Sequence, residues 1–333
     1  MKRFMNDPAG MVEDYLTGLQ AAHPGLVAVD SDQRIVTRAR AKPAGLVGLV
    51  AGGGSGCEPL HTGFVGPGML DAACPGAIFT SPVPRQIIAA TRAADRGAGA
   101  LHIVKNFTGE VMNFGMAQEI MAFDGQRVET VLVNDDCAIP DDGTNAGRRG
   151  LGATVLVEKI AGAATERGDD LATVAAIARR VVARARTYSI GLTSCTPPAR
   201  GRPIYRMAED EMDLGIGISG SPGLGRVPLE PASGIAARMV QTVIADLAPA
   251  PGTLLLAMVS GLGGTPEAEL YLLYGQIAAA LTRRGFAPVR SLVGNLVTSL
   301  DQQGAALTLL ALEDDLIPLW DAPVQTPALR WGM

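Results

Sequence analysis

Hydrophobic residues in this chain occur in two patterns, short continuous runs and longer stretches with helical spacing. The continuous runs in the first part of the chain predict buried strands at 46–51, 77–81, 100–106 and 128–136. The helical spacing predicts helices at 11–22, 84–97, 109–123, 152–168 and 170–187. Pro84 is placed to start the second helix and Gly97 to end it. Strands that alternate with helices favour a mainly parallel sheet with helices on both faces.

The pattern changes after Ser194, where a polar, proline-rich stretch at 196–203 is typical of a link between domains. A second series of strand-like and helix-like runs follows at 214–219, 232–247, 253–260, 267–285, 288–297 and 305–313. We therefore expect an α/β fold of two α/β domains with mixed or mainly parallel sheets. The predicted domains are residues 1–190 and 191–333.

Composition excludes several classes of partner. The 333 residues carry a net charge of −5 with 18% charged residues, and no basic cluster is present that could neutralise a nucleic-acid backbone. No apolar run reaches the ~20 residues that span a bilayer, and the N-terminus lacks the apolar region of a secretory signal. We therefore expect a cytoplasmic protein with neither a nucleic-acid nor a membrane partner.

Residue types that bind metals or undergo redox chemistry are few and scattered. The four cysteines, Cys57, Cys74, Cys137 and Cys195, form no CxxC pair, so no zinc or redox motif is indicated. The acids at 134–136 follow a predicted strand, and solvated acids explain them better than a metal site does. We expect no metal to be bound.

The stretch "LVAGGGSGCEP" at 49–59 is the strongest local signal for a ligand. Glycines lack a Cβ atom, so backbone N–H groups there can turn inward and approach a ligand closely. No G-K-[ST] follows, so the stretch is not a nucleotide-binding P-loop. Two interpretations stay open: a loop that cradles a ligand, which the glycine density favours, and a tight structural turn.

Two further strand ends carry polar residues. Lys105 ends a predicted strand, at the edge where α/β sheets place their ligands. Glu110 lies in the first turn of the next helix, either as a functional carboxylate or as an acid that only stabilises the helix dipole. Ser219 is the last residue of the predicted strand at 214–219. A glycine-rich turn follows it, and this pattern alone is weak evidence for a site. His61 and His102 have no ligand pattern around them, so we expect structural histidines.

Taken in order, several segments resemble one family. They read "HPGL", "GGGSG.EP", "IFTSP", "IVKNFTG", "EKIAGAATERG", "GLGGTP", "TSLD" and "LWDAPVQTPAL.WG". Together they resemble the dihydroxyacetone-binding K subunit of bacterial dihydroxyacetone kinases over essentially the whole chain. The resemblance implies a homodimer that binds a small polyhydroxylated compound and works with a nucleotide-carrying L subunit. It implies no cofactor on this chain, because ATP, or ADP with Mg²⁺, would sit on that partner.

The resemblance also implies substrate-binding residues. Gly54, Ser55 and Gly56 match the family's substrate loop. Ser81 lies in the matching "IFTSP" segment, and Lys105 matches the lysine that contacts the ligand.

At the three catalytic positions this chain departs from the family pattern. Family members use one histidine to form a hemiaminal with the substrate carbonyl, and a second histidine with an aspartate to handle the proton of the reacting hydroxyl. Here the hemiaminal position is Ser219, the second histidine position is Cys57 and the aspartate position is Glu110. A serine has no nitrogen for a hemiaminal, so the substrate is expected to bind non-covalently.

Three functions fit these substitutions. The first is a kinase substrate subunit for a small ketose or related compound, with Glu110 as the base. The second is a non-catalytic paralogue that senses a ligand or regulates an L-type partner. The third is a different enzyme that uses Cys57 as nucleophile or acid, assisted by Glu110 or His61. The chain alone is expected not to hydrolyse ATP.

Overall fold

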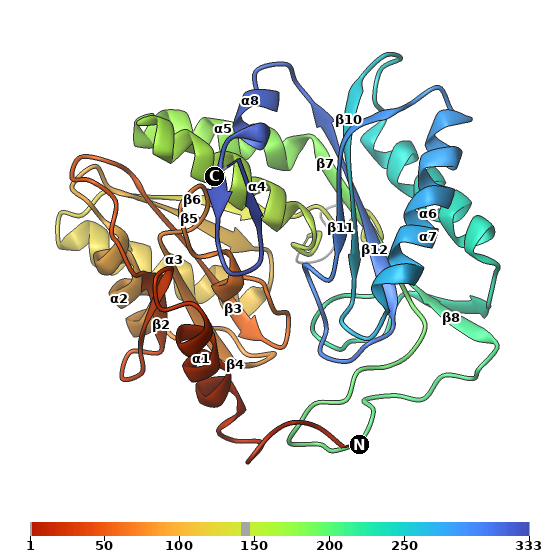
Figure 1. Ribbon diagram of the computed structural model, residues 1–333, viewed down its shortest axis with the longest axis horizontal. Coiled ribbons are helices and arrows are strands. Elements are labelled where there is room, and N and C mark those ends of the chain that lie inside the picture. The colour runs from red at the N-terminus through yellow and green to blue at the C-terminus, as the bar shows by residue number, and fades with distance from the viewer. Residues whose placement is uncertain (1, 141–146, 333) are drawn as a thin grey trace. The chain divides into compact units, whose positions relative to one another are not determined.

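The computed structural model describes residues 2–140 and 147–332 (Figure 1). The chain divides into two compact units, each made of separate stretches of sequence. The first unit contains Lys2–Val133, Thr154–Val182 and residues 315–332, and the second contains Asn134–Ala153 and Ala183–Asp314. The predicted boundary between residues 190 and 191 does not coincide with these units. It would cut strand β7 (Ala185–Gly191), which is hydrogen-bonded into the sheet of the second unit.

The first unit is built on a six-stranded sheet with the order β1-β2-β4-β3-β5-β6. The pairs β4–β3, β3–β5 and β5–β6 are parallel, whereas β1–β2 and β2–β4 are antiparallel. The strands are β1 (Val27–Asp30), β2 (Ile35–Arg38), β3 (Gly48–Ser55), β4 (Ala72–Ile78), β5 (Ala100–Lys105) and β6 (Val128–Val133). The predicted mainly parallel core is therefore present in this unit.

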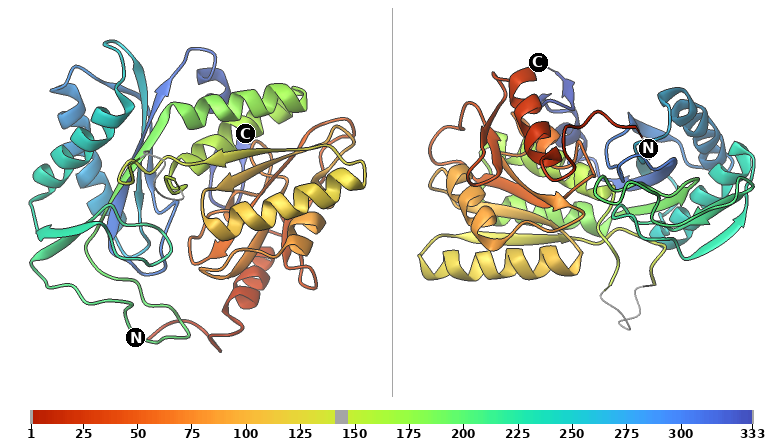
Figure 2. Two further views of the ribbon diagram at one scale, coloured as in Figure 1. Left: turned by 180° about the vertical axis from the view of Figure 1, so that it is seen from behind. Right: turned by 90° about the horizontal axis from the view of Figure 1, so that it is seen from below.

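Five helices accompany this sheet. They are α1 (Met11–Ala22), α2 (Pro84–Ala94), α3 (Thr108–Phe123), α4 (Ala153–Arg167) and α5 (Leu171–Ala183). Figure 2 shows α3, drawn in yellow, lying across the first sheet. Helix α2 packs on β3 and β4, and α3 packs on β5 and β6. Helix α4 is buried from Ala153 to Thr165, including two charged residues, Glu158 and Lys159.

The second unit has a six-stranded sheet with the order β11-β10-β12-β7-β8-β9. Only β10 and β11 are parallel, so this sheet is mixed and predominantly antiparallel. Its strands are β7 (Ala185–Gly191), β8 (Glu211–Leu214), β9 (Gly225–Pro228), β10 (Leu254–Gly261), β11 (Pro288–Gly294) and β12 (Gly304–Leu312). Helices α6 (Ala232–Leu247) and α7 (Glu267–Thr282) pack on it through an apolar core. Elements α8 (Ile317–Asp321), β13 (Val324–Gln325) and β14 (Arg330–Trp331) follow in the sequence and belong to the first unit.

Some predicted elements differ from the structure. The run at 214–219 is not a strand beyond Leu214, although Ile216 and Ile218 are buried. The predicted helix at 170–187 ends at Ala183, and β7 begins two residues later. Both errors have one cause: burial makes turns and strands as apolar as their neighbours, so hydrophobicity alone does not fix the boundary.

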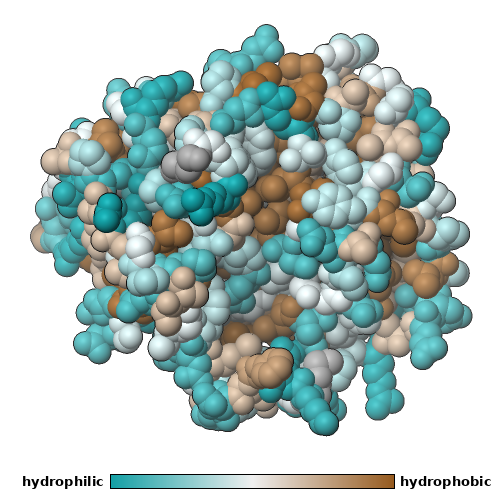
Figure 3. Space-filling view, in the orientation of Figure 1, coloured by the Kyte–Doolittle hydropathy of each residue, from teal (hydrophilic) through white to brown (hydrophobic). Residues whose placement is uncertain are grey.

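The surface is mainly polar. On the face shown in Figure 3, hydrophilic residues cover most of the area and hydrophobic residues form separate patches. One helix of the first unit is an exception, because α3 exposes Val111 and, at helical spacing, Met112, Met116, Ile120 and Phe123. Within residues 2–140 and 147–332, no helix has both the length and the apolar character that crossing a membrane requires.

Candidate functional site

The glycines that the sequence placed in a loop are part of strand β3, which continues to Ser55. They are required because other atoms come close to their Cα positions. A Cβ on Gly54 would lie 2.6 Å from the backbone nitrogen of Thr80, and one on Gly53 would lie 2.2 Å from Lys105 Nζ. The glycines therefore let a lysine head and a neighbouring backbone segment approach the end of β3. The stretch that we expected to be a loop is thus a strand with close neighbours.

Lys105, at the end of β5, lies at the centre of a buried polar cluster in the first unit. Its Nζ is 2.9 Å from His61 Nε2 and 3.8 Å from Glu110 Oε1. The side chains of Lys105 and Glu110 are only 3% and 9% exposed. Neighbouring parallel strands and the helix after β5 thus bring the three groups together beside Gly53, as strand ends do in α/β sheets.

Glu110 is held in place by Ser81. Ser81 Oγ donates a hydrogen bond to Glu110 Oε2 at 2.6 Å, which leaves Oε1 on the side of Lys105. Gly109 makes room for this contact, because a Cβ there would lie 2.4 Å from Ser81 Oγ. The segment before α2 is tied to α3 as well, since Asn113 Nδ2 donates to the carbonyl of Pro82 at 2.8 Å. Glu110 is therefore an oriented carboxylate with one oxygen directed at the lysine.

His61, expected to be structural and named as an assisting group only in the third function, belongs to this cluster. Its Nδ1 lies 2.6 Å from Glu158 Oε1, and its Nε2 contacts Lys105. Burial, together with the charge of Lys105, holds the pKa of His61 well below its usual value. Burial also raises the pKa of Glu158 well above its usual value, against the opposing effect of the Lys105 charge. No local pattern could have revealed this contact, since Glu158 follows His61 by 97 residues.

His102 has the structural role that the sequence predicted. It is fully buried, its Nε2 lies 2.8 Å from Thr91 Oγ1, and its ring packs edge-on against Phe114. Burial lowers its pKa to about 3. It therefore stays neutral at ordinary pH.

The remaining predicted residues of the glycine-rich stretch also lie at the end of β3. Ser55 Oγ donates to the carbonyl of Gly76 at 2.7 Å, which ties β3 to β4. Gly56 has a φ of +102°, and its N–H donates to Glu58 at 3.0 Å. Cys57 is buried, with 5% of its surface exposed. These residues closely follow Gly53, which lies against Lys105. Their roles in binding stay predictions.

Ser219 lies in the second unit, in the segment between β8 and β9. Asp135 and Asp136, which we expected to be solvated, are fully buried and have partners in the same unit. Asp135 accepts hydrogen bonds from the backbone N–H groups of Leu151 and Ala153 at 2.7 and 2.8 Å, where α4 begins. Asp136 pairs with Arg149 at 2.6 Å. Both carboxylates are thus already used to fix the start of α4 and the chain beside it.

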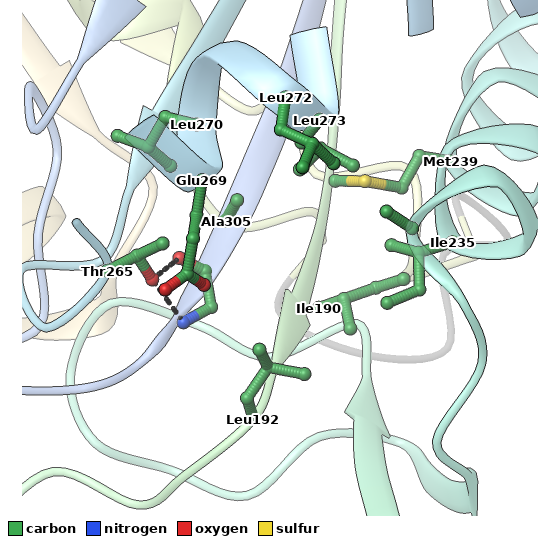
Figure 4. Close-up of a pocket in the computed structure, with 12 residues that line it drawn as sticks. Ile190, Leu192, Ile235, Met239, Thr265, Glu269, Leu270, Leu272, Leu273 and Ala305 are labelled. Carbon is green, nitrogen blue, oxygen red and sulfur yellow. Dashed lines mark hydrogen bonds between the residues drawn. The ribbon is translucent and has the colours of Figure 1, made fainter. Parts of the chain in front are cut away.

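The second unit also contains an apolar cavity of about 280 Å³ between its sheet and the first turns of α6 and α7 (Figure 4). Ile190, Ile235, Met239 and Leu273 contribute to its lining. Its one threonine, Thr265, already exchanges hydrogen bonds with Gly304. A polyhydroxylated compound would find few partners there, so the Lys105 cluster is the better candidate for such a ligand.

This is a two-sheet α/β architecture in which a lysine, a carboxylate and close-packed glycines meet at the end of a parallel strand, a candidate site for a small polar molecule. The sequence profile of the Dak1 domain matches residues 17–328, and the chain belongs to this family. The sequence-based family assignment and the α/β fold class are thereby confirmed.

Individual relatives agree with this assignment. The chain is 40% identical to the PEP-dependent dihydroxyacetone kinase, dihydroxyacetone-binding subunit DhaK, of Escherichia coli (strain K12), with 100% of both chains covered. It is 39% identical to the D-erythrulose kinase of Mycolicibacterium smegmatis, over 100% of this chain and 57% of that one. Among solved structures, the dihydroxyacetone kinase operon co-activator Dha-DhaQ superposes with a TM-score of 0.89 at 30% identity, over 95% of this chain and 97% of that one.

Proposed function

We propose that this chain is the substrate-binding subunit of a dihydroxyacetone-kinase-like phosphotransferase that acts on a small ketose or a similar polyhydroxylated compound. The observation that carries the proposal is the 3.8 Å separation of Lys105 Nζ and Glu110 Oε1 in a buried cluster. A single hydroxyl oxygen can lie within hydrogen-bond distance of two atoms so spaced, at about 2.8 Å from each. That oxygen would accept from the lysine and donate to the carboxylate.

This arrangement suits phosphoryl transfer to a hydroxyl. Glu110 Oε1 is the base that takes the hydroxyl proton, while Lys105 stabilises the negative charge that develops on the oxygen. Ser81 keeps the carboxylate in position through its hydrogen bond to Oε2. Since phosphoryl transfer depends mainly on positioning and electrostatics, a fixed glutamate is sufficient even though Cys57 stands where the family has a histidine.

The ligand in this proposal is held without a covalent bond. Ser219 offers a hydroxyl where family members have the nitrogen that forms a hemiaminal, so Gly54, Ser55, Gly56 and the lysine must bind the ketose by hydrogen bonds alone. Ketoses of three or four carbons are the natural candidates, because relatives are named for dihydroxyacetone and for D-erythrulose.

The phosphoryl donor is proposed to reside on a separate L-type nucleotide subunit in the cytoplasm, with this chain as a homodimer. The apolar side chains that α3 exposes, Met112, Met116, Ile120 and Phe123, support contact with another protein surface, since α3 begins next to the cluster. Light scattering of the purified chain and co-purification with an L-type subunit test these two associations.

The proposed base is tested by Glu110→Gln with Glu119→Gln as its matched control. Both variants remove one negative charge from α3, but residue 119 is exposed and lies away from Lys105. Ketose binding is measured by calorimetry, and phosphorylation is measured in the presence of an L-type subunit and its phosphoryl donor. We expect Glu110→Gln to bind ketose and to lose at least ~100-fold in turnover, with Glu119→Gln unchanged. Unchanged turnover in Glu110→Gln would exclude this base.

A regulatory paralogue is the second candidate, favoured by the likeness to an operon co-activator. Such a protein would bind ketose and an L-type subunit or a transcription factor, but no ketose phosphate would form. Phosphate transfer to ketose in the complete mixture separates the two functions. A third function, an enzyme that uses the Cys57 thiol with Glu110, requires Cys57→Ala to abolish activity, whereas the kinase proposal predicts that turnover persists.

A further inference from the structure

Behind Lys105 lies a buried chain of two hydrogen bonds that the proposed phosphotransferase mechanism does not use. Glu158 Oε1 is 2.6 Å from His61 Nδ1, and His61 Nε2 is 2.9 Å from Lys105 Nζ. Glu158 is on α4, His61 is in the segment after β3 and Lys105 ends β5. All three belong to the first unit, and none of their side chains is more than 4% exposed.

The His61 imidazole limits where the protons of these two hydrogen bonds can lie. Because burial keeps His61 neutral, its ring carries one N–H, which donates through one nitrogen while the other accepts. If Nδ1 donates, Glu158 is a carboxylate and Nε2 accepts from a Lys105 ammonium. If Nε2 donates, Glu158 is a carboxylic acid and Lys105 is a neutral amine. Both arrangements contain the same number of protons. A proton on Nε2 requires a neutral lysine, because only the neutral amine can accept, whereas a proton on Nδ1 is compatible with the ammonium ion.

The carboxylate of Glu110 distinguishes the two arrangements. Its Oε1 is 3.8 Å from Lys105 Nζ, and an anion at that distance favours the charged form of the amine. The burial that raises the pKa of Glu158 acts in the other direction, and the charge of Lys105 offsets it only in part. The ammonium form, with the proton of His61 on Nδ1, is the arrangement in which Lys105 keeps its ion pair with Glu110.

We infer that Glu158 and His61 are positioning residues that hold Lys105 as an ammonium ion with a donor directed at the substrate oxygen. The inference deepens the proposed function and rests on it for the identity of the substrate. It explains an otherwise costly feature: Glu158 is fully buried, and its Oε2 has no hydrogen-bond partner among the described residues. A buried carboxyl group with an unpaired oxygen lowers stability. A purely structural role does not explain why such a group is kept at this position.

The tautomer of His61 can be read directly. The chain contains only three histidines, His23, His61 and His102, so a protein labelled with ¹⁵N-histidine gives three resolved ring systems. The signals of His61 are identified by their loss in His61→Gln. We expect a neutral ring with Nδ1 protonated and Nε2 unprotonated throughout pH ~6 to ~8. A proton on Nε2, or an imidazolium in this range, would overturn the inference whatever the ligand is.

Two substitutions separate the contacts made by His61. In His61→Gln, the longer amide can place its oxygen near the Nε2 position and accept from Lys105. In His61→Asn, the shorter amide can reach Glu158 but leaves Lys105 without an acceptor. Calorimetric titration with dihydroxyacetone and with erythrulose should show at least ~10-fold weaker binding for His61→Asn and a smaller loss for His61→Gln. His23→Gln, outside the cluster, serves as the control and should bind like the unmodified chain.

The outcomes are distinguishable. If His61→Asn remains folded by its thermal midpoint and binds ketose as tightly as the unmodified chain, His61 does not position Lys105. If His61→Gln loses as much affinity as His61→Asn, the acceptor at Nε2 is not what matters, and the inference also fails. If the unmodified chain shows the expected tautomer but binds neither ketose, the proposed substrate class fails while the assignment of His61 and Glu158 stands.

Discussion

Gly53→Ala is the substitution that separates the site from the fold most cleanly. The added Cβ would lie 2.2 Å from Lys105 Nζ, 3.2 Å from Glu110 Oε1 and 3.3 Å from His61 Nε2. Nonbonded carbon contacts lie near ~3.5–4 Å, so the lysine head has to move by about 1.5 Å. A displacement of that size breaks its 2.9 Å hydrogen bond to His61.

The cost should fall on function and not on folding. The atom that must move is the end of a flexible side chain, and Gly53 lies in β3 without a left-handed φ. In a strand, alanine is favoured over glycine by roughly 0.5–1 kcal/mol, which partly offsets the loss of the lysine contact. A misplacement of ~1 Å can lower turnover ~100-fold. We therefore expect turnover and ketose affinity to fall at least ~100-fold and ~10-fold, with the unfolding free energy changed by less than ~2 kcal/mol.

The assay combines ketose calorimetry, turnover with an L-type subunit, and urea denaturation. Gly115→Ala is the matched control, because Gly115 is in α3 and a Cβ there meets nothing within 4 Å. That variant should keep its affinity and gain up to ~1 kcal/mol in stability. If Gly53→Ala binds ketose normally, the ligand does not contact the lysine head in the position described, and the site is wrongly located.

Two further predictions concern stability. Asp71→Asn should lower the unfolding free energy by about 3–5 kcal/mol in urea denaturation, because Arg38 and Lys42, at 2.9 and 2.8 Å from Asp71, lose their buried counter-charge and keep only the part-exposed Glu166. A loss below ~1 kcal/mol would show that the network is not coupled. His102, with its pKa lowered by burial from 6.5 to about 3, binds a proton below pH 6.5 only in the unfolded chain. Its contribution to stability is therefore complete above pH 6.5 and falls as the pH decreases, by roughly 2 kcal/mol at pH ~5. His102→Gln should remove that part of the acid sensitivity, and identical pH profiles of the two proteins would contradict the assignment.

Two helices were predicted from the sequence to the residue, whereas α2, predicted at 84–97, ends at Ala94. Helices α1 (Met11–Ala22) and α6 (Ala232–Leu247) have the predicted bounds, because their periodic apolar faces pack on their own sheets. Strand β7 was missed because it follows α5 so closely that its first residues extend the helical pattern. The short strands β1 and β2 were missed because four residues are too few for a periodicity to be recognised.

The site was predictable only in part. Lys105 and Glu110 could be found because strand ends and first helical turns are local features of the sequence. The sequence could not show that Gly53 and Gly54 belong to a strand, because glycine has a low strand propensity. A glycine is needed at position 53 because Lys105, 52 residues further along, packs against it. The contacts of His61 could not be found for a similar reason: its partners Lys105 and Glu158 are brought to it only by the folded sheet and α4.

The central proposal is that the site holds a ketose by hydrogen bonds alone. The direct test is to titrate the ¹⁵N-labelled chain with [2-¹³C]dihydroxyacetone, record the carbon spectrum of the complex and then denature the protein. We predict saturable binding, no coupling of the labelled carbon to a protein nitrogen, and complete release of unmodified ketose on unfolding. A tetrahedral carbon coupled to nitrogen would contradict the account.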